Sequence, residues 1–158
     1  MKRVYQEVEQ LGEMPTLADN PEDPEGQLAK WLDWYIRRQL SPKSEILARF
    51  IRREIADPTP MLQEIVDQTV TPVYEAMSTL VAAILPPGTP TDLIRVHCGQ
   101  VNSPTVVKML CKPISDRMPM VPVSELDVDS LVLHTQQCVM AGLQASGGKV
   151  SERWLVHS

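Results

Sequence analysis

Five dipeptides that pair a helix-capping residue with proline divide this chain into segments. They are Asp23-Pro24, Ser41-Pro42, Thr59-Pro60, Thr89-Pro90 and Ser103-Pro104. A Ser, Thr or Asp side chain accepts hydrogen bonds from the unpaired N–H groups of a first helical turn. Proline suits the next position, because its fixed φ is helical and its missing N–H would have had no partner there. The dipeptides therefore predict the starts of successive α-helices.

Between these dipeptides, apolar residues recur three and four positions apart, as on the buried face of an amphipathic helix. No stretch alternates apolar and polar residues for long enough to predict a strand. We therefore expect an all-α fold, a bundle of about six helices. The expected helices span residues 2–13, 24 to about 40, 42–56, 60 to about 85, 90–113 and 124 to about 145.

Pro72 lies inside the apolar pattern of the longest expected helix. An internal proline removes one backbone hydrogen bond and kinks the helix, at a cost of about 3 kcal/mol in an ordinary interior. A bent helix can leave space beside it. The sequence therefore indicates a place where a cavity can form.

The composition suits one soluble domain. The chain has 158 residues, of which 43% are hydrophobic and only 4% aromatic, so the core is expected to be aliphatic and methionine-rich. We expect a linker helix at residues 1–14, the main domain at 15–146 and a short tail at 147–158.

The net charge is −5 and no expected helix carries a stripe of Lys and Arg. We therefore expect that this chain alone binds neither duplex DNA nor an anionic membrane.

The cysteines, the first residues and the apolar runs of the chain favour a location in the reducing cytoplasm. Three cysteines, Cys98, Cys111 and Cys138, are an odd number at unrelated spacings within expected helices, so they are expected to be buried, small hydrophobic side chains. The chain opens on a charged amphipathic stretch and not on a signal peptide. Its longest apolar run, residues 80–85, is far shorter than a membrane span.

No residue pattern predicts an enzyme, a metal site or a cofactor. His97, Cys98 and Cys111 match no compact zinc spacing. Adjacent residues on a helix point in different directions, so His97 and Cys98 do not form a base and nucleophile by adjacency alone. The glycines form no phosphate-binding loop. We therefore expect no catalytic residue, no metal and no cofactor.

Three segments together resemble one protein family. Residues 47–54, followed by Asp57-Pro58-Thr59-Pro60, resemble a helix end in the regulatory domains of TetR-family transcriptional regulators. Gly99-Gln100 resembles the Gly-Gln pair of the same subgroup, and residues 134–145 resemble the final helix, with its Ala-Gly-Leu-x-Ala ending. The resemblance runs from about Val4 to Ala145.

The resemblance implies a TetR-like C-terminal domain that binds a small, often hydrophobic effector and dimerises through its last two long helices. In such regulators a helix-turn-helix module precedes this region, and effector binding changes the spacing of two DNA-reading heads to release the operator, as in a repressor. The sequence has no room for that module before Lys2, so DNA contact is expected only through a module outside this chain.

We expect the effector pocket beside Pro72, because His97 and Gln100 place polar groups one turn apart on an otherwise apolar helix. The expected lining residues are Phe50, Val70, Tyr74, Met77, His97 and Gln100. Two alternatives stay open. His97 and Gln100 can instead bond to neighbouring backbone or lie at a subunit seam, and Met77 can fill the core.

We also expect a homodimer. Residues 93–110 and 126–143 carry enough apolar positions to face both their own core and a partner, giving a four-helix seam around a two-fold axis. The expected interface residues are Leu93, Val96, Val107, Leu110, Leu131, Val139 and Leu143. An alternative function, a helical interaction or adaptor module without a small-molecule pocket, fits the same helices. An enzyme built on a helical bundle is the third reading.

Overall fold

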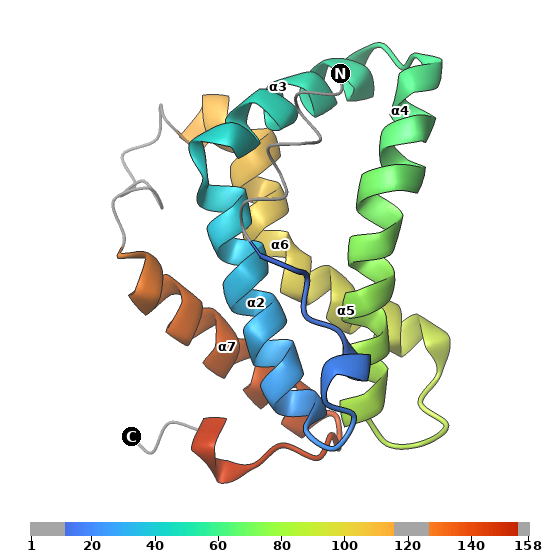
Figure 1. Cartoon of the computed structure of the whole chain (residues 1–158), viewed down its shortest axis with the longest axis vertical. Coiled ribbons are helices and arrows are strands. Elements are labelled where there is room, and N and C mark those ends of the chain that lie inside the picture. The colour runs from blue at the N-terminus through green and yellow to red at the C-terminus, as the bar shows by residue number, and fades with distance from the viewer. Residues whose placement is uncertain (1–11, 116–126, 155–158) are drawn as a thin grey trace.

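The computed structural model describes residues 12–115 and 127–154, without the side chains of residues 42, 43 and 104–115. These residues form helices and short helical turns with no strand among them, which confirms the all-α prediction (Figure 1). The helices are α2 (Pro24–Leu40), α3 (Pro42–Ala56), α4 (Pro60–Ile65), α5 (Thr71–Ile84), α6 (Thr91–Ser115) and α7 (Val128–Ala145). The shorter turns are η2 (Leu17–Asp19), η3 (Val66–Val70) and η5 (Glu152–Trp154). The linker helix expected at residues 1–14 lies mostly outside the described residues.

Two of the five cap-and-proline dipeptides act as predicted. The Asp23 carboxylate accepts from the Gly26 N–H at 3.0 Å at the start of α2. The Thr59 hydroxyl accepts from the Met61 N–H at 3.3 Å at the start of α4. In both helices proline occupies the first helical position, as its geometry favours.

In the other three dipeptides, the hydroxyl of the capping residue donates a hydrogen bond instead of accepting one from the helix. Ser41, Thr89 and Ser103 each donate to the carbonyl oxygen three residues earlier, at 2.6–3.0 Å. Helix α3 still begins directly after Ser41, whereas α6 begins at Thr91, two residues after Thr89. Helix α6 continues through Ser103-Pro104 without a new start. The dipeptide pattern therefore marks helix starts less reliably where a local carbonyl competes for the hydroxyl.

The long helix predicted from Pro60 contains a π-turn at its proline. Figure 1 shows α4, η3 and α5 as one continuous rod. Pro72 has no N–H to donate to the carbonyl of Gln68, one turn earlier, so an α-helical ladder cannot pass it unchanged. The structure widens instead, and the Thr71 N–H donates to the Val66 carbonyl five residues earlier. The proline thus remodels the helix without ending it.

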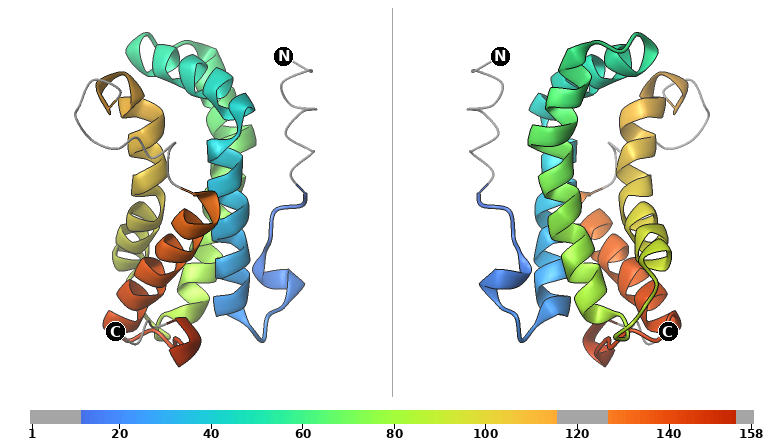
Figure 2. Two further views of the ribbon diagram at one scale, coloured as in Figure 1. Left: turned by 90° about the vertical axis from the view of Figure 1, so that its left-hand side faces the viewer. Right: turned by 90° about the vertical axis from the view of Figure 1, so that its right-hand side faces the viewer.

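The core lies where α2, α5, α6 and α7 meet. Its largest fully buried side chains are Leu28, Trp31, Leu32, Met77, Leu80, Val81, Ile84, Cys98, Met140 and Leu143. Helix α3 crosses one end of the bundle, between α2 and α4 (Figure 1). Figure 2 shows α6 on one side of α2 and α5, and the segment containing η2 on the other.

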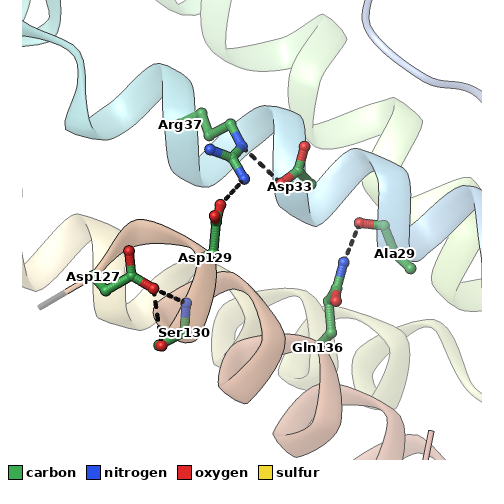
Figure 3. Close-up of polar contacts among 7 residues, drawn as sticks. All are labelled: Ala29, Asp33, Arg37, Asp127, Asp129, Ser130 and Gln136. Carbon is green, nitrogen blue, oxygen red and sulfur yellow. Dashed lines mark hydrogen bonds and ion pairs between the residues drawn. The ribbon is translucent and has the colours of Figure 1, made fainter.

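Polar contacts fix α7 against α2 (Figure 3). Gln136 Nε2 donates to the Ala29 carbonyl at 2.8 Å, and the Arg37 guanidinium pairs with Asp129. The α7 N-cap is Asp127, whose carboxylate accepts from Ser130 N–H at 2.9 Å. The helix start expected at residue 124 lies outside the described residues.

The segment expected to be a tail is anchored as far as it is described. The Ser151 N–H donates to the Glu25 carboxylate at 3.0 Å, and Arg153 pairs with Asp23 at 2.7 Å. Trp154 packs against the core. Residues 147–154 therefore close the lower end of the bundle near the start of α2.

Candidate functional site

A pocket of about 180 Å³ lies beside the π-turn, and we call it the π-turn pocket. Helix α2 contributes Trp34, Tyr35, Arg38 and Gln39, and α3 contributes Ser44, Leu47 and Ile51. The π-turn and α5 contribute Thr69, Val70, Val73 and Tyr74, and α6 contributes Asn102. Apolar and aromatic walls with a few polar groups are typical of small-molecule sites.

The local sequence explains why this pocket exists. The π-turn forced by Pro72 carries Thr69 and Val70 in the pocket wall. Single π-turns inside α-helices occur frequently at functional sites. Helix α3, which crosses the end of the bundle, contributes Leu47 and Ile51 to the pocket lining. The expectation of a cavity beside Pro72 therefore has a counterpart in the structure.

Tyr74 connects this pocket to α6. Its hydroxyl is hydrogen-bonded to the Cys98 thiol, and Cys98 is fully buried. Burial raises the pKa of Tyr74, and the neighbouring thiol raises it further. Burial also raises the pKa of Cys98, with partial offset by hydrogen bonds to Ser78 and Tyr74. Both groups are therefore neutral at physiological pH, and the pair acts as a structural contact between α5 and α6.

A second hollow, the α6–α7 groove, has a volume of about 380 Å³. It is lined by His97, Gln100, Val101, Leu131, His134, Thr135, Cys138, Val139, Gly142 and Leu143. His97 Nε2 lies 3.0 Å from the Ser146 hydroxyl, which connects α6 to the end of α7. The groove is therefore formed by the last two described helices.

The structure does not gather the six expected effector residues around one pocket. Val70 and Tyr74 line the π-turn pocket, whereas His97 and Gln100 line the α6–α7 groove. Met77 has 0% exposure and fills the core, as the alternative interpretation held. Phe50 lies on α3 between two lining residues but is not itself among them. The expected residues are therefore divided between two hollows and the core, because α6 turns His97 and Gln100 towards α7.

The expected dimer residues also separate. Leu93 and Val96 are exposed on α6, and Leu131 and Val139 line the α6–α7 groove. Leu143 is only 1% exposed and belongs largely to the core of its own protomer. The side chains of Val107 and Leu110 lie outside the described residues.

Sequence reasoning missed most of the π-turn pocket. Trp34, Tyr35 and Arg38 line the pocket from α2, which the sequence predicted only as an amphipathic helix. Trp34 and Tyr35 precede Arg38 by about one helical turn, which is only a weak signal that the three share a face of the helix. Nothing local in the sequence shows that α3 folds over that face.

The cysteines and possible metal ligands can be placed only in part. Cys98 is buried as expected, whereas Cys138 is exposed, with its sulfur 3.5 Å from His134 Nε2. The Cys111 side chain lies outside the described residues. Among the described side chains, no group of three or more His, Cys, Asp or Glu residues is arranged to hold a metal ion.

Within residues 12–115 and 127–154, no helix combines the length and apolar character needed to cross a bilayer.

Comparison with known families gives one match. Residues 24–143 match the family described as "HTH-type transcriptional dual regulator CecR, C-terminal domain". The match begins at the first residue of α2 and ends in the last turn of α7, so it includes both hollows. Comparisons with curated proteins and with solved structures gave no match. The chain therefore belongs to the CecR C-terminal domain family of TetR-type transcriptional regulators, and it is a regulatory domain and not an enzyme.

Proposed function

We propose that this domain senses a small hydrophobic effector in the π-turn pocket and dimerises through α6 and α7. The observation that carries the effector site is the pocket beside the Pro72 π-turn, with apolar walls and few polar groups. In the intact cytoplasmic regulator, a helix-turn-helix module contacts DNA, consistent with a family defined as a C-terminal domain. Effector binding then releases the operator, as in a repressor.

The surface of α6 and α7 supports the dimer. Val96 is 55% exposed on α6, next in sequence to the groove residue His97, and α7 contributes the apolar side chains of Leu131 and Val139 to the groove. Gly99 and Gly142 leave open space, since a Cβ added at either would meet no heavy atom within 4 Å. Two such helices from each subunit can form an isologous four-helix seam.

Helix α6 is the element common to both sites. Asn102 lines the π-turn pocket, and Cys98 contacts Tyr74 from the same helix. His97 and Gln100 lie on the side of α6 that lines the groove. A ligand that displaces α6 therefore changes the seam, provided that it binds the two positions of α6 with different affinity.

The effector site is tested with a panel of neutral, ring-containing compounds in thermal unfolding. A ligand that binds only the folded state stabilises it by about 2.7 kcal/mol at a hundredfold excess over Kd. We expect stabilisers whose effect weakens in Tyr74→Ala and in Val70→Gln, a change at a half-exposed wall position that avoids a core cavity. Compounds that stabilise the wild type and both variants equally would show that the ligand binds elsewhere.

The dimer is tested by sedimentation with a matched pair of variants. Val96 on α6 and Ile55 on α3 are each 55% exposed, so a glutamate at either position has a similar cost within the protomer. We expect twice the chain mass for the wild type and Ile55→Glu, and a monomer for Val96→Glu. A monomeric wild type, or a dimer that survives Val96→Glu, contradicts the proposed seam.

A further inference from the structure

Arg38 presents its charge to the π-turn pocket, whereas its neighbour Arg37 is fully paired. Arg37 Nε lies 2.8 Å from Asp33, and its guanidinium also pairs with Asp129 (Figure 3). The Arg38 guanidinium instead lies over the ring of Trp34, 5.1 Å from the ring centroid, and Arg38 and Trp34 both line the pocket. The two adjacent arginines therefore have different roles.

The pocket supplies no counter-ion to Arg38. Its lining contains aromatic, aliphatic and neutral polar side chains, and neither Asp nor Glu. Burial lowers the pKa of Arg38, and among the described residues no carboxylate contributes to the charge balance around it. A charge withdrawn from water without an opposite charge is costly to the fold. An anionic ligand would remove that cost.

Two features of α2 stabilise the charge of Arg38 without accepting hydrogen bonds from its guanidinium N–H groups. Arg38 lies in the last turn of the helix, where the dipole favours a cation, and the Trp34 face also attracts one. Neither feature accepts an N–H hydrogen bond. Within the described chain, no acceptor is hydrogen-bonded to the guanidinium, so its planar set of donors is available to a carboxylate.

The size of the pocket limits the rest of the ligand. An apolar cavity of about 150 Å³ accepts benzene, and the π-turn pocket has about 180 Å³. Its lining includes the aromatic residues Trp34 and Tyr35 and the aliphatic residues Leu47 and Ile51, which suits one flat ring. The chain is net negative, but charges farther than about 8 Å are largely screened at physiological salt. The local guanidinium therefore outweighs the overall charge.

From this geometry we infer that the effector class is a small aromatic carboxylate, whose carboxylate pairs with Arg38 while its ring lies among the apolar walls. This inference rests on the proposed function, because it assumes that the π-turn pocket is the effector site. It adds a charge requirement that a purely hydrophobic effector does not have.

The test compares benzoate with benzamide, its neutral isostere, by calorimetric titration at neutral pH. We expect wild-type protein to bind benzoate about tenfold more tightly than benzamide, or better. Arg38→Met should weaken benzoate by a similar factor and leave benzamide nearly unchanged, while Arg38→Lys restores part of the difference. The matched control is Arg49→Gln, which removes an exposed charge of α3 away from the pocket and should change neither ligand.

Other outcomes overturn the inference and separate it from the proposed function. Equal affinity for benzoate and benzamide refutes charge recognition while leaving the pocket as a ligand site. If benzoate does not bind, but neutral compounds still bind in a way that depends on Val70 and Tyr74, charge recognition is likewise refuted and the pocket remains a ligand site. Benzoate binding that is insensitive to Arg38→Met, or equally weakened by Arg49→Gln, shows that the anion binds elsewhere. Circular dichroism is used to check that Arg38→Met is folded, and the comparison of benzoate with benzamide on the wild-type protein does not depend on any variant.

Discussion

Replacing Gly99 and Gly142 with alanine should have opposite effects on the protomer and on the dimer. Both glycines lie inside helices, where glycine is about 0.8–1.0 kcal/mol less favourable than alanine. Outside the glycine's own helical turn, a Cβ at either position would meet no heavy atom of the described residues within 4 Å. The other five glycines have a positive φ or a neighbouring atom within contact distance. Only these two therefore lack an explanation within the protomer.

The structure gives the size of the protomer effect. The two substitutions together should stabilise an isolated protomer by up to about 2 kcal/mol. For a chain of this length, about 1 kcal/mol shifts Tm by about 2–4 °C, so Tm should rise by about 4–8 °C where the protein is monomeric. In the dimer, the added methyl groups would hold the facing helices apart. We expect the dimer dissociation constant to rise by about tenfold or more, equivalent to about 1.4 kcal/mol.

The assay is sedimentation equilibrium for the dissociation constant, with thermal unfolding over a dilution series. Ala83→Gly, at an exposed position of α5, is the matched control, because it should lower protomer stability by the propensity difference without changing dimerisation. A double alanine variant that dimerises as tightly as the wild type, or more tightly, would refute close approach of a partner at these glycines.

Three further variants test the protomer itself. Met77→Ala should lower the free energy of unfolding in urea by about 2–5 kcal/mol, because Met77 is fully buried in the core; an effect on effector affinity alone would contradict that placement. Thr59→Ala should cost about 1–2 kcal/mol in the same assay, since it removes both the cap of α4 and a 2.7 Å hydrogen bond to the buried Glu54 carboxylate; an unchanged unfolding midpoint would argue against that cap. The hydrogen bond from Gly26 N–H lowers the pKa of Asp23, so its contribution is present above the ordinary carboxyl pKa of about 3.9 and is lost as pH falls through the folded pKa. Asp23→Asn keeps a cap, so the variant should lose stability less steeply than the wild type as pH falls; parallel pH curves would be inconsistent with this assignment.

Much of the helical order could be predicted from local sequence. Asp23 and Thr59 cap helices as their types and positions indicate, because those hydrogen bonds depend on residues within one turn. Ser103 could not be assigned in this way. Its hydroxyl donates to the backbone carbonyl oxygen of Gln100 inside a continuing helix. Whether such a hydroxyl caps a helix or donates in this way depends on whether the helix is already stabilised by its neighbours.

The candidate site could be predicted only where its cause was local. Pro72 indicated a disturbed helix, and the pocket wall with Val70 and Tyr74 lies there. His97 and Gln100, expected beside Val70 and Tyr74, line the α6–α7 groove in the structure. Helix α6 buries Cys98 and Val101 towards the core, and this rotation turns His97 and Gln100 to the α6–α7 groove. An apolar pattern on several sides of a helix does not specify which side faces the core.

The two adjacent arginines of α2 show why the charge in the pocket was not visible in the sequence. Both lie in the last turn, where the helix dipole favours a cation, so their position along the helix does not distinguish them. Successive residues on a helix point about 100° apart, and in the fold Arg37 reaches Asp129, 92 positions along the chain. Arg38 lines a pocket whose other residues come from α3, the π-turn, α5 and α6 as well as α2. The distinction between a paired and an available guanidinium is therefore a product of the tertiary structure, and it is the reason that Arg38 is the residue to substitute when the chemistry of the effector is tested.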